Sequence, residues 1–187
     1  MVALLRKPVV WVLLVVLAVA GAVALVLFQP WLLFVDEKVN EAGPPGIEAP
    51  AVPGQSPQGG QPQSGQPQAA RPQVVSTGSF ISHEHGTSGT AKVIRLADGK
   101  HVLRLENLDT SNGPDLRVWL SDQPVKGGTG GWFVFDDGAY VELGKLKGNK
   151  GNQNYEIPAS ADLGKLKSVT IWCKRFHVSF GAAALNA

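Results

Sequence analysis

The sequence contains few of the residues on which most catalytic and cofactor sites depend. One cysteine, Cys173, occurs among 187 residues, so no disulfide can form within the chain. The sequence has no nucleophile elbow, phosphate-binding loop, zinc-ligand spacing or paired carboxylates. Conventional catalysis therefore has no motif to support it, and the sequence leaves both enzymatic activity and any cofactor unknown.

Excess charge of one sign is also missing. Lysine and arginine together number 17 and aspartate and glutamate 15, which gives a formal net charge of +2. A nucleic-acid-binding domain typically carries a strongly basic patch or stripe. The near-neutral balance therefore excludes nucleic acid as the expected partner.

Charged residues are absent from one long stretch near the N-terminus. Residues 9–28 are apolar and uncharged, and a second apolar stretch follows at residues 31–35. About 20 helical residues, at a rise of roughly 1.5 Å each, cross the roughly 30 Å hydrocarbon core of a bilayer. We expect residues 1–35 to form a cytoplasmic N-terminus and a transmembrane anchor.

The residues on each side of the anchor predict its orientation. Arg6 and Lys7 precede the apolar run, whereas Asp36 and Glu37 follow it, so the positive-inside rule places the N-terminus in the cytoplasm. The C-terminal domain then lies outside the cell membrane. A cleaved signal peptide is the alternative, because residues 18–20 form a small-x-small triplet. Cleavage there would leave an exposed apolar N-terminus, which favours a retained single-pass anchor.

Residues 36–74 have the composition of a linker. Proline, glycine, glutamine, alanine and serine dominate, and Gln-Pro-Gln recurs around Pro62 and Pro67. Such a segment buries too little apolar surface to offset the entropy of ordering, so we expect it to be disordered. This composition agrees with a spacer that lifts the domain through a surface layer, and equally with a linker whose length is unimportant.

Residues 75–187 have the pattern of a folded β domain. Short runs of β-branched, aromatic and leucine residues recur, and no stretch sustains a helical period. The predicted strands are residues 92–96, 101–105, 116–121, 132–135, 139–143 and 168–180. Asp98-Gly99 predicts a two-residue type I′ hairpin turn, and Asp137-Gly138 predicts another. We expect an all-β fold, either an antiparallel β-sandwich or a related barrel.

Four blocks of this domain resemble the ordered signature of the DM13 family. They are residues 113–116 (GPDL), 143–149 (LGKLKGN), 151–158 (GNQNYEIP) and 168–176 (SVTIWCKRF). The resemblance covers residues 78–185. It implies a β-sandwich-type domain and a redox or electron-transfer role around the cysteine that aligns with Cys173.

Cys173 has two competing interpretations. If residues 171–180 form one strand, Cys173 shares a face with Arg175 and His177, opposite Phe176 and Val178. Nearby positive charge would then favour the reactive thiolate. The alternative is a buried cysteine that acts as a small hydrophobe. A single cysteine in an exported chain also leaves open a disulfide-linked dimer.

His83 and His85 are weak candidates for metal ligands. On a strand, residues two apart project from the same face, roughly 7 Å from each other, which makes half of a metal or haem site. The neighbouring Ser82 and Gly86 instead indicate a polar loop in which the two histidines are merely solvated.

Two functions of different class remain. In the first, the domain is a redox or electron-transfer module at the outer face of the membrane, centred on Cys173, with an unknown redox partner. In the second, it is a non-catalytic binding or adhesion module for a protein, a glycan or a small hydrophobic ligand. Trp119, Trp132 and the loops between Gly127 and Gly138 would then offer an aromatic surface.

Overall fold

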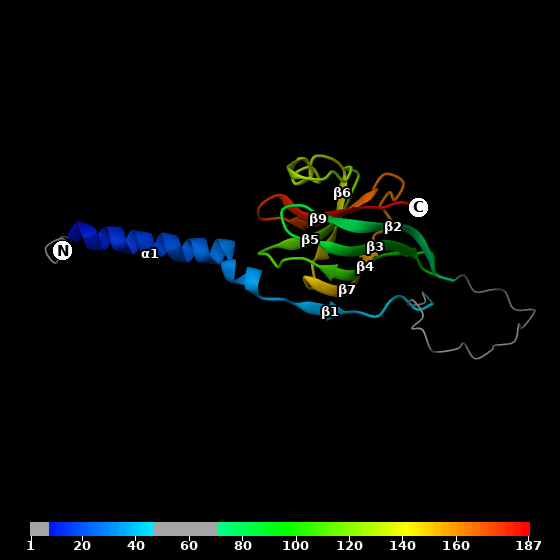
Figure 1. The fold of residues 1–187 in the computed structure, drawn as a ribbon, viewed down its shortest axis with the longest axis horizontal. Helices are drawn as coiled ribbons and strands as arrows, with labels where there is room; N and C mark the ends of the chain where they lie inside the picture. Colours follow the sequence, from blue (N-terminus) through cyan, green and yellow to red (C-terminus); the bar gives the residue numbers. More distant parts are fainter. Residues whose placement is uncertain (1–7, 47–70) are drawn as a thin grey trace, which may run out of the picture.

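The structure is a computed structural model that describes residues 8–46 and 71–187, except for the side chains of Leu33 and Phe34. Most of the expected linker, residues 47–70, lies outside the described residues. The described part contains one long helix, two short 3-10 helices and nine strands (Figure 1).

Helix α1 (Pro8–Phe28) extends away from the β domain as a single rod (Figure 1). Its 21 residues include no buried side chain. At roughly 1.5 Å per residue such a helix is about 31 Å long, which matches a hydrocarbon core of about 30 Å. The helix is therefore long and apolar enough to cross a membrane. Gln29 ends it with a positive φ of 44°, and Pro30 starts the 3-10 helix η1 (Pro30–Phe34).

All nine strands belong to one sheet in the order β1-β7-β4-β3-β2-β9-β8-β5-β6. Neighbouring strands are antiparallel except β1 and β7, which are parallel. The strands are β1 (Lys38–Asn40), β2 (Gln73–Ser82), β3 (Ser88–Arg95), β4 (His101–Asp109), β5 (Leu116–Ser121), β6 (Tyr140–Lys145), β7 (Lys150–Ile157), β8 (Ser168–Cys173) and β9 (Val178–Ala184). The second 3-10 helix, η2 (Thr129–Gly131), lies between β5 and β6.

Strand β2 connects the two halves of the sheet. Its residues 73–79 pair with β3, whereas residues 80–82 pair with β9. The sheet curls at this change of partner, so that its two halves enclose one core. The expected all-β class is confirmed, and the strands form a single curled sheet, a half-barrel, rather than two separate sheets.

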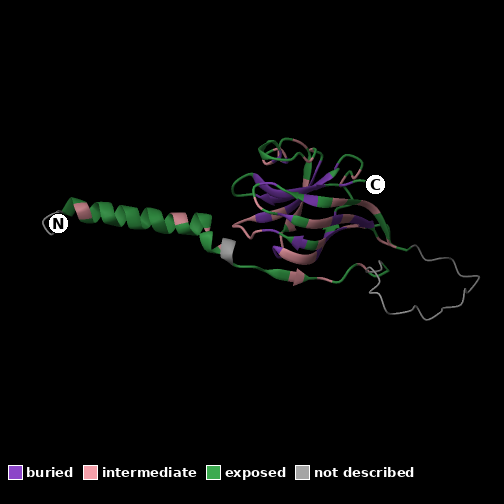
Figure 2. Cartoon of the chain, viewed as in Figure 1, coloured by how far each residue is buried: buried purple, intermediate pink, exposed green. Residues whose placement is uncertain are grey.

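The main core lies inside the curl. Leu103 and Leu105 of β4 meet Val118 and Leu120 of β5 and Ile171 of β8 in one cluster, and all five side chains are fully buried. Figure 2 shows the buried residues concentrated in these strands, whereas helix α1 is exposed. The predicted alternation of β5 is confirmed, because Leu116, Val118 and Leu120 all face this core.

A second, smaller cluster covers the opposite face of β5 and β8. It consists of Trp119, Phe135, Trp172 and Ala182. Phe135 comes from the loop between β5 and β6, so the loop closes this face. The prediction of a strand at residues 132–135 was wrong, because these residues bend across the sheet instead of extending it.

The hairpin between β3 and β4 is present, but its turn differs from the predicted type I′. That type needs a positive φ at two central residues. Only Gly99 has one (85°), and Asp98 does not. The Gly99 N–H donates to Leu96 O (3.0 Å) and the Leu96 N–H to Lys100 O (2.8 Å), which closes a three-residue loop.

The segment after the helix is attached to the domain, which the sequence analysis did not anticipate. Strand β1 lies parallel to β7, and the Lys150 and Glu41 N–H groups donate to Glu37 O (3.2 Å) and Asn152 O (2.9 Å). The Asn149 side chain accepts from the Glu37 N–H (2.6 Å). Gly151 has a φ of 103°, and a Cβ there would lie 2.0 Å from Val39 O. The glycine-rich block before and within β7 is therefore the part of the domain with which β1 pairs.

Candidate functional site

Cys173 is the last residue of β8 and is fully buried in the main core. The predicted continuous strand through residue 180 was wrong, because residues 174–177 form a tight turn between β8 and β9. His177, with a φ of 52°, completes this turn. The reversal places the Cys173 side chain among apolar residues and not beside the Arg175 and His177 side chains.

The environment of the thiol keeps it protonated. Burial raises the pKa of Cys173. The backbone N–H groups of Phe176, Arg175 and Asp115 counteract this by lowering the pKa, and the negative charge of Asp115 raises it. Thiolate formation is therefore disfavoured, and the thiol is inaccessible to a reagent in this conformation.

Three aromatic rings form a continuous stack, and one of them, Trp172, is the residue before Cys173 in the chain. Tyr140 of β6 stacks on Trp119 of β5, with ring centroids 4.1 Å apart and planes within 5°. Trp119 in turn stacks on Trp172 of β8, with centroids 5.2 Å apart and planes 27° apart. We call Tyr140, Trp119 and Trp172 the aromatic stack. Because β6, β5 and β8 are neighbours in the sheet, diagonal cross-strand pairing aligns the three rings.

The stack leads from solvent to the interior. Tyr140 is 45% exposed, whereas Trp119 is 3% exposed and Trp172 is fully buried. Trp172 precedes Cys173 directly, although their side chains occupy opposite faces of β8 and different core clusters. The outer end is therefore accessible to a partner, and the inner end adjoins the thiol through one peptide unit.

The two indole N–H groups of the stack have different environments. Trp119 Nε1 donates to Glu142 Oε2 (3.3 Å), and this carboxylate also pairs with Arg117 (2.8 Å) and Lys174 (3.2 Å). Trp172 Nε1 is buried and has no hydrogen-bond partner among the described residues. A base is thus available to the indole of Trp119, whereas the indole of Trp172 has none within the described chain.

His83 and His85 lie in the bend after β2, and the structure gives them separate partners. His83 is buried, and its Nε2 donates to Lys126 O (3.0 Å), so its Nδ1 accepts from the Ser179 hydroxyl (2.7 Å) in the neutral ring. Burial lowers the pKa of His83, which agrees with a neutral ring. Both nitrogens are therefore occupied by the protein.

His85 instead contacts Glu84, with 2.5 Å between Nε2 and Oε2, and its ring packs on Phe180 at a centroid distance of 3.9 Å. Within residues 8–46 and 71–187, no group of three or more His, Cys, Asp or Glu side chains is arranged to hold a metal. A metal role for His83 and His85 stays a prediction.

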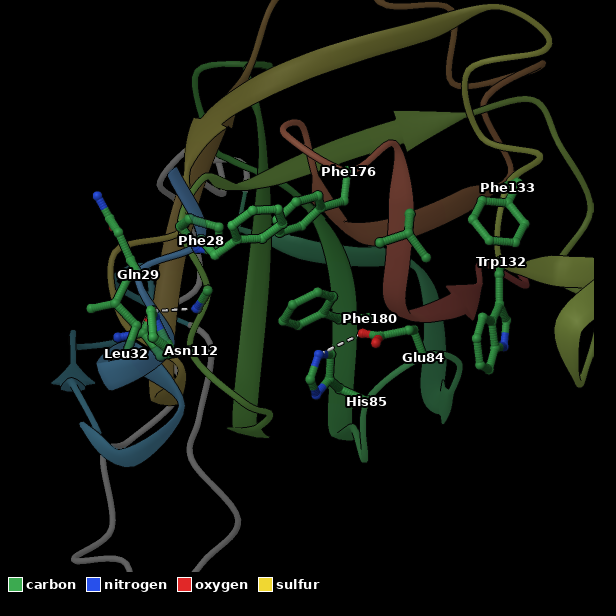
Figure 3. A pocket seen from close by; sticks show the side chains of 14 residues that line it. Phe28, Gln29, Leu32, Glu84, His85, Asn112, Trp132, Phe133, Phe176 and Phe180 are labelled. Atoms are coloured by element: carbon green, nitrogen blue, oxygen red, sulfur yellow. Dashed lines mark hydrogen bonds and ion pairs between the residues drawn. The ribbon is translucent and has the colours of Figure 1, made fainter. Parts of the chain in front are cut away.

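A cavity of about 450 Å³ lies between the end of α1 and the domain (Figure 3). Phe28 of the helix, His85, Phe176 and Phe180 line it together with Trp132 and Phe133. The sequence pattern predicted that Trp119 and Trp132 share one aromatic surface. Only Trp132 lines this cavity, because Trp119 is buried in the stack.

The residues predicted from sequence therefore fall in three places. Cys173 lies in the main core, His83 in a buried hydrogen-bond network, and His85 in the cavity. Tyr140 and Glu142 were missed, because their relation to Trp119 depends on the pairing of β5 with β6. The signal available in the sequence was a tyrosine two residues before a glutamate in a predicted strand, a spacing that places both side chains on the same face.

Comparison with known proteins agrees with the sequence pattern. A family model described as "Electron transfer DM13" matches residues 79–185. This range includes the complete aromatic stack, Cys173 and the loop that carries Trp132. No curated protein and no solved structure matches the chain.

Proposed function

The chain belongs to the DM13 electron-transfer family, and on this premise we propose that its β domain transfers single electrons through the aromatic stack to and from Cys173. The observation that carries the proposal is the stack itself. Tryptophan and tyrosine are side chains that can lose one electron, and close ring contact shortens each transfer. Rings at 4.1 and 5.2 Å make two such short steps.

The proposed location is the outer face of the cell membrane. Helix α1 is the anchor, and Arg6 and Lys7 before it favour a cytoplasmic N-terminus. The domain then meets an extracytoplasmic redox partner. Tyr140 is the contact point that we assign to this partner, because it is the exposed end of the stack.

The chemical step removes one electron from the Cys173 thiol. An external one-electron oxidant removes an electron from Tyr140, which releases its phenol proton to solvent. Trp119 then reduces the Tyr140 radical, which takes a proton back, and Trp172 reduces oxidised Trp119. While Trp119 is oxidised, its indole N–H transfers its proton to the Glu142 carboxylate, which stabilises the oxidised ring, and the proton returns when Trp119 is reduced. Cys173 then donates an electron to oxidised Trp172 and becomes a thiyl radical, and its proton is released to solvent when the turn at residues 174–177 opens. An external one-electron donor reverses the step.

The buried thiol supports this chemistry over thiol–disulfide exchange. Exchange needs an accessible thiolate that attacks a second sulfur directly. Cys173 is fully buried and its pKa is raised. Electrons can reach a group that no reagent can touch, so burial is compatible with the proposed role. The same burial disfavours a dimer linked through Cys173.

Flash photolysis of the full-length protein in detergent tests the stack. Trp11, Trp31 and Trp132 are first changed to phenylalanine, so that every tryptophan radical arises on Trp119 or Trp172. A photogenerated ruthenium oxidant then starts the reaction. We expect a transient tryptophan radical whose yield falls in Tyr140→Phe and in Trp119→Phe. Tyr155→Phe is the matched control, because Tyr155 is buried outside the stack. A yield that Trp119→Phe leaves unchanged would overturn the proposal.

A further inference from the structure

The cavity at the end of helix α1 lies where the chain leaves the membrane. Phe28, the last residue of the helix, lines it, and its ring stacks on Phe176 of the domain at 5.6 Å. Arg175 also donates to Leu27 O, and Asn112 donates to Val35 O (3.3 Å). Only residues 35–37 separate η1 from β1, which is paired with β7. These attachments hold the cavity beside the membrane surface.

The wall of the cavity is apolar and aromatic. Phe28, Trp132, Phe133, Phe176 and Phe180 contribute rings from the helix, the β5–β6 loop, the β8–β9 turn and β9 (Figure 3). Phe133 is 55% exposed and Phe176 is 42% exposed. A volume of about 450 Å³ falls within the range of small-molecule sites, roughly 300–1,000 Å³. The cavity therefore fits a flat, apolar molecule.

Charge narrows the class of molecule. Among the described residues, no lysine or arginine lines the cavity, and the one carboxylate of its lining, that of Glu84, is paired with His85. An anionic lipid headgroup would lack an unpaired cationic partner within the lining, because Arg175 donates to Leu27 O beside the cavity and does not line it. A neutral ring is therefore favoured over a phosphate or a carboxylate.

Two polar groups of the lining can bind a carbonyl oxygen. The Glu84 carboxylate holds the His85 ring, which Figure 3 shows within the lining of the cavity. Trp132 Nε1 is buried and has no hydrogen-bond partner among the described residues. A ligand that carries carbonyl oxygens can accept a hydrogen bond from His85, whereas Trp132 Nε1 can donate only after the protein atoms that cover it move aside.

We propose that this cavity binds the ring of a membrane quinone. The inference rests on the proposed electron-transfer function, because a quinone is the class of neutral, membrane-soluble aromatic ring that exchanges electrons. Its isoprenoid tail would stay in the bilayer beside α1, and its ring would lie against the stacked Phe28 and Phe176 rings, on the side of His85 and Phe180. As the imidazolium whose Nε2–H is paired with the Glu84 carboxylate, His85 donates a hydrogen bond from Nδ1–H to one carbonyl oxygen of the quinone.

Binding of decylubiquinone to the full-length protein in nanodiscs of neutral phospholipid tests the inference. Quenching of tryptophan fluorescence gives the affinity, and an azidoquinone photoprobe gives the position. We expect saturable binding, crosslinks at Trp132, Phe133 or Phe176, and about tenfold weaker binding in His85→Asn, as the loss of one strong hydrogen bond predicts. His101→Asn is the matched control, because His101 opens β4 and does not line the cavity.

Several results would overturn the inference. The quinone could partition into the nanodisc without saturable binding to the protein, or bind His85→Asn and wild type with equal affinity. A phospholipid could occupy the cavity and resist displacement by the quinone, or a second copy of the chain could cover Phe133 and Phe176 in a dimer. The assay follows binding and no electron transfer. Failure here with an intact tryptophan radical signal therefore removes the quinone site alone, and the reverse pattern removes the electron-transfer proposal.

Discussion

Reactivity of Cys173 toward an alkylating reagent gives a quantitative test of its burial. The reagent can reach the thiol only after the turn at residues 174–177 opens. Opening breaks the bonds from the Lys174 N–H to Asp115 O (2.9 Å) and from the Phe176 N–H to Cys173 O (3.3 Å). At about 1 kcal/mol net for each hydrogen bond and about 1 kcal/mol for exposing a small apolar side chain, opening costs about 3 kcal/mol. We therefore expect alkylation about 100-fold slower than that of a free thiol.

The pH dependence of the rate supplies a second, independent signature. A free thiol reaches its maximum rate above its pKa of about 8.5. Because burial raises the pKa of Cys173, the closed state stays protonated there. The rate should then continue to rise about tenfold per pH unit above 8.5, since each unit increases the population of open thiolate. Iodoacetamide labelling followed by mass spectrometry measures both quantities.

The same pKa shift predicts a loss of stability at high pH. Above about pH 8.5 the unfolded chain releases the thiol proton, whereas the folded chain retains it, so the free energy of unfolding should fall as pH rises. Cys173→Ala should lack this slope. Rapid alkylation of the native protein at pH 7, at the rate of a free thiol, would refute the burial argument.

Three further predictions concern other parts of the domain. Burial lowers the pKa of His83, so the unfolded state gains a proton first as pH falls below about 6.5. The free energy of unfolding should then decrease by up to about 1.4 kcal/mol for each unit by which the pH falls. Thermal unfolding at pH 5 to 7 should show this slope in wild type and lose it in His83→Gln. Gly151→Ala should speed hydrogen exchange at the Glu37 and Glu41 amides, because its Cβ would collide with Val39 O. Gly144→Ala is the control, since Gly144 also has a positive φ but an added Cβ there meets no atom within 4 Å; equal exchange in both variants would contradict the docking of β1. Glu142→Gln should slow the conversion of the Trp119 radical cation to the neutral radical in transient absorption, because an amide is a much weaker base than a carboxylate. An unchanged rate of conversion would exclude proton transfer to Glu142.

Local sequence pattern was sufficient where a strand buries alternate residues. The prediction for residues 116–121 coincides with β5, because leucine and valine alternate there with residues of the other face. Strand β7 was missed, because Gly151, Asn152, Gln153 and Asn154 are poor strand formers. Their polar side chains are used by the fold: Asn152 and Asn154 bind the segment around β1, and Gln153 bonds Gly148 O (2.6 Å).

Features that depend on pairing between distant residues could not be predicted. Strand β1 precedes its partner β7 by more than 100 residues, and its three residues are too few to show a strand pattern. The turn after Cys173 depends on a positive φ at His177, a residue for which this conformation is uncommon. That turn ends the alternation, so Cys173 faces the main core with Val169 and Ile171 of β8, and Phe176 in the turn does not decide its face. The aromatic stack likewise follows from the register of β6, β5 and β8.

The most direct test of the proposed electron transfer is the lifetime of the tryptophan radical in wild type and in Cys173→Ala. Both proteins carry the Trp11, Trp31 and Trp132 changes to phenylalanine and are oxidised by the same laser flash. If Cys173 donates an electron to oxidised Trp172, the tryptophan radical should decay faster in the protein that retains Cys173 and persist in Cys173→Ala. Equal lifetimes would contradict a redox role for Cys173.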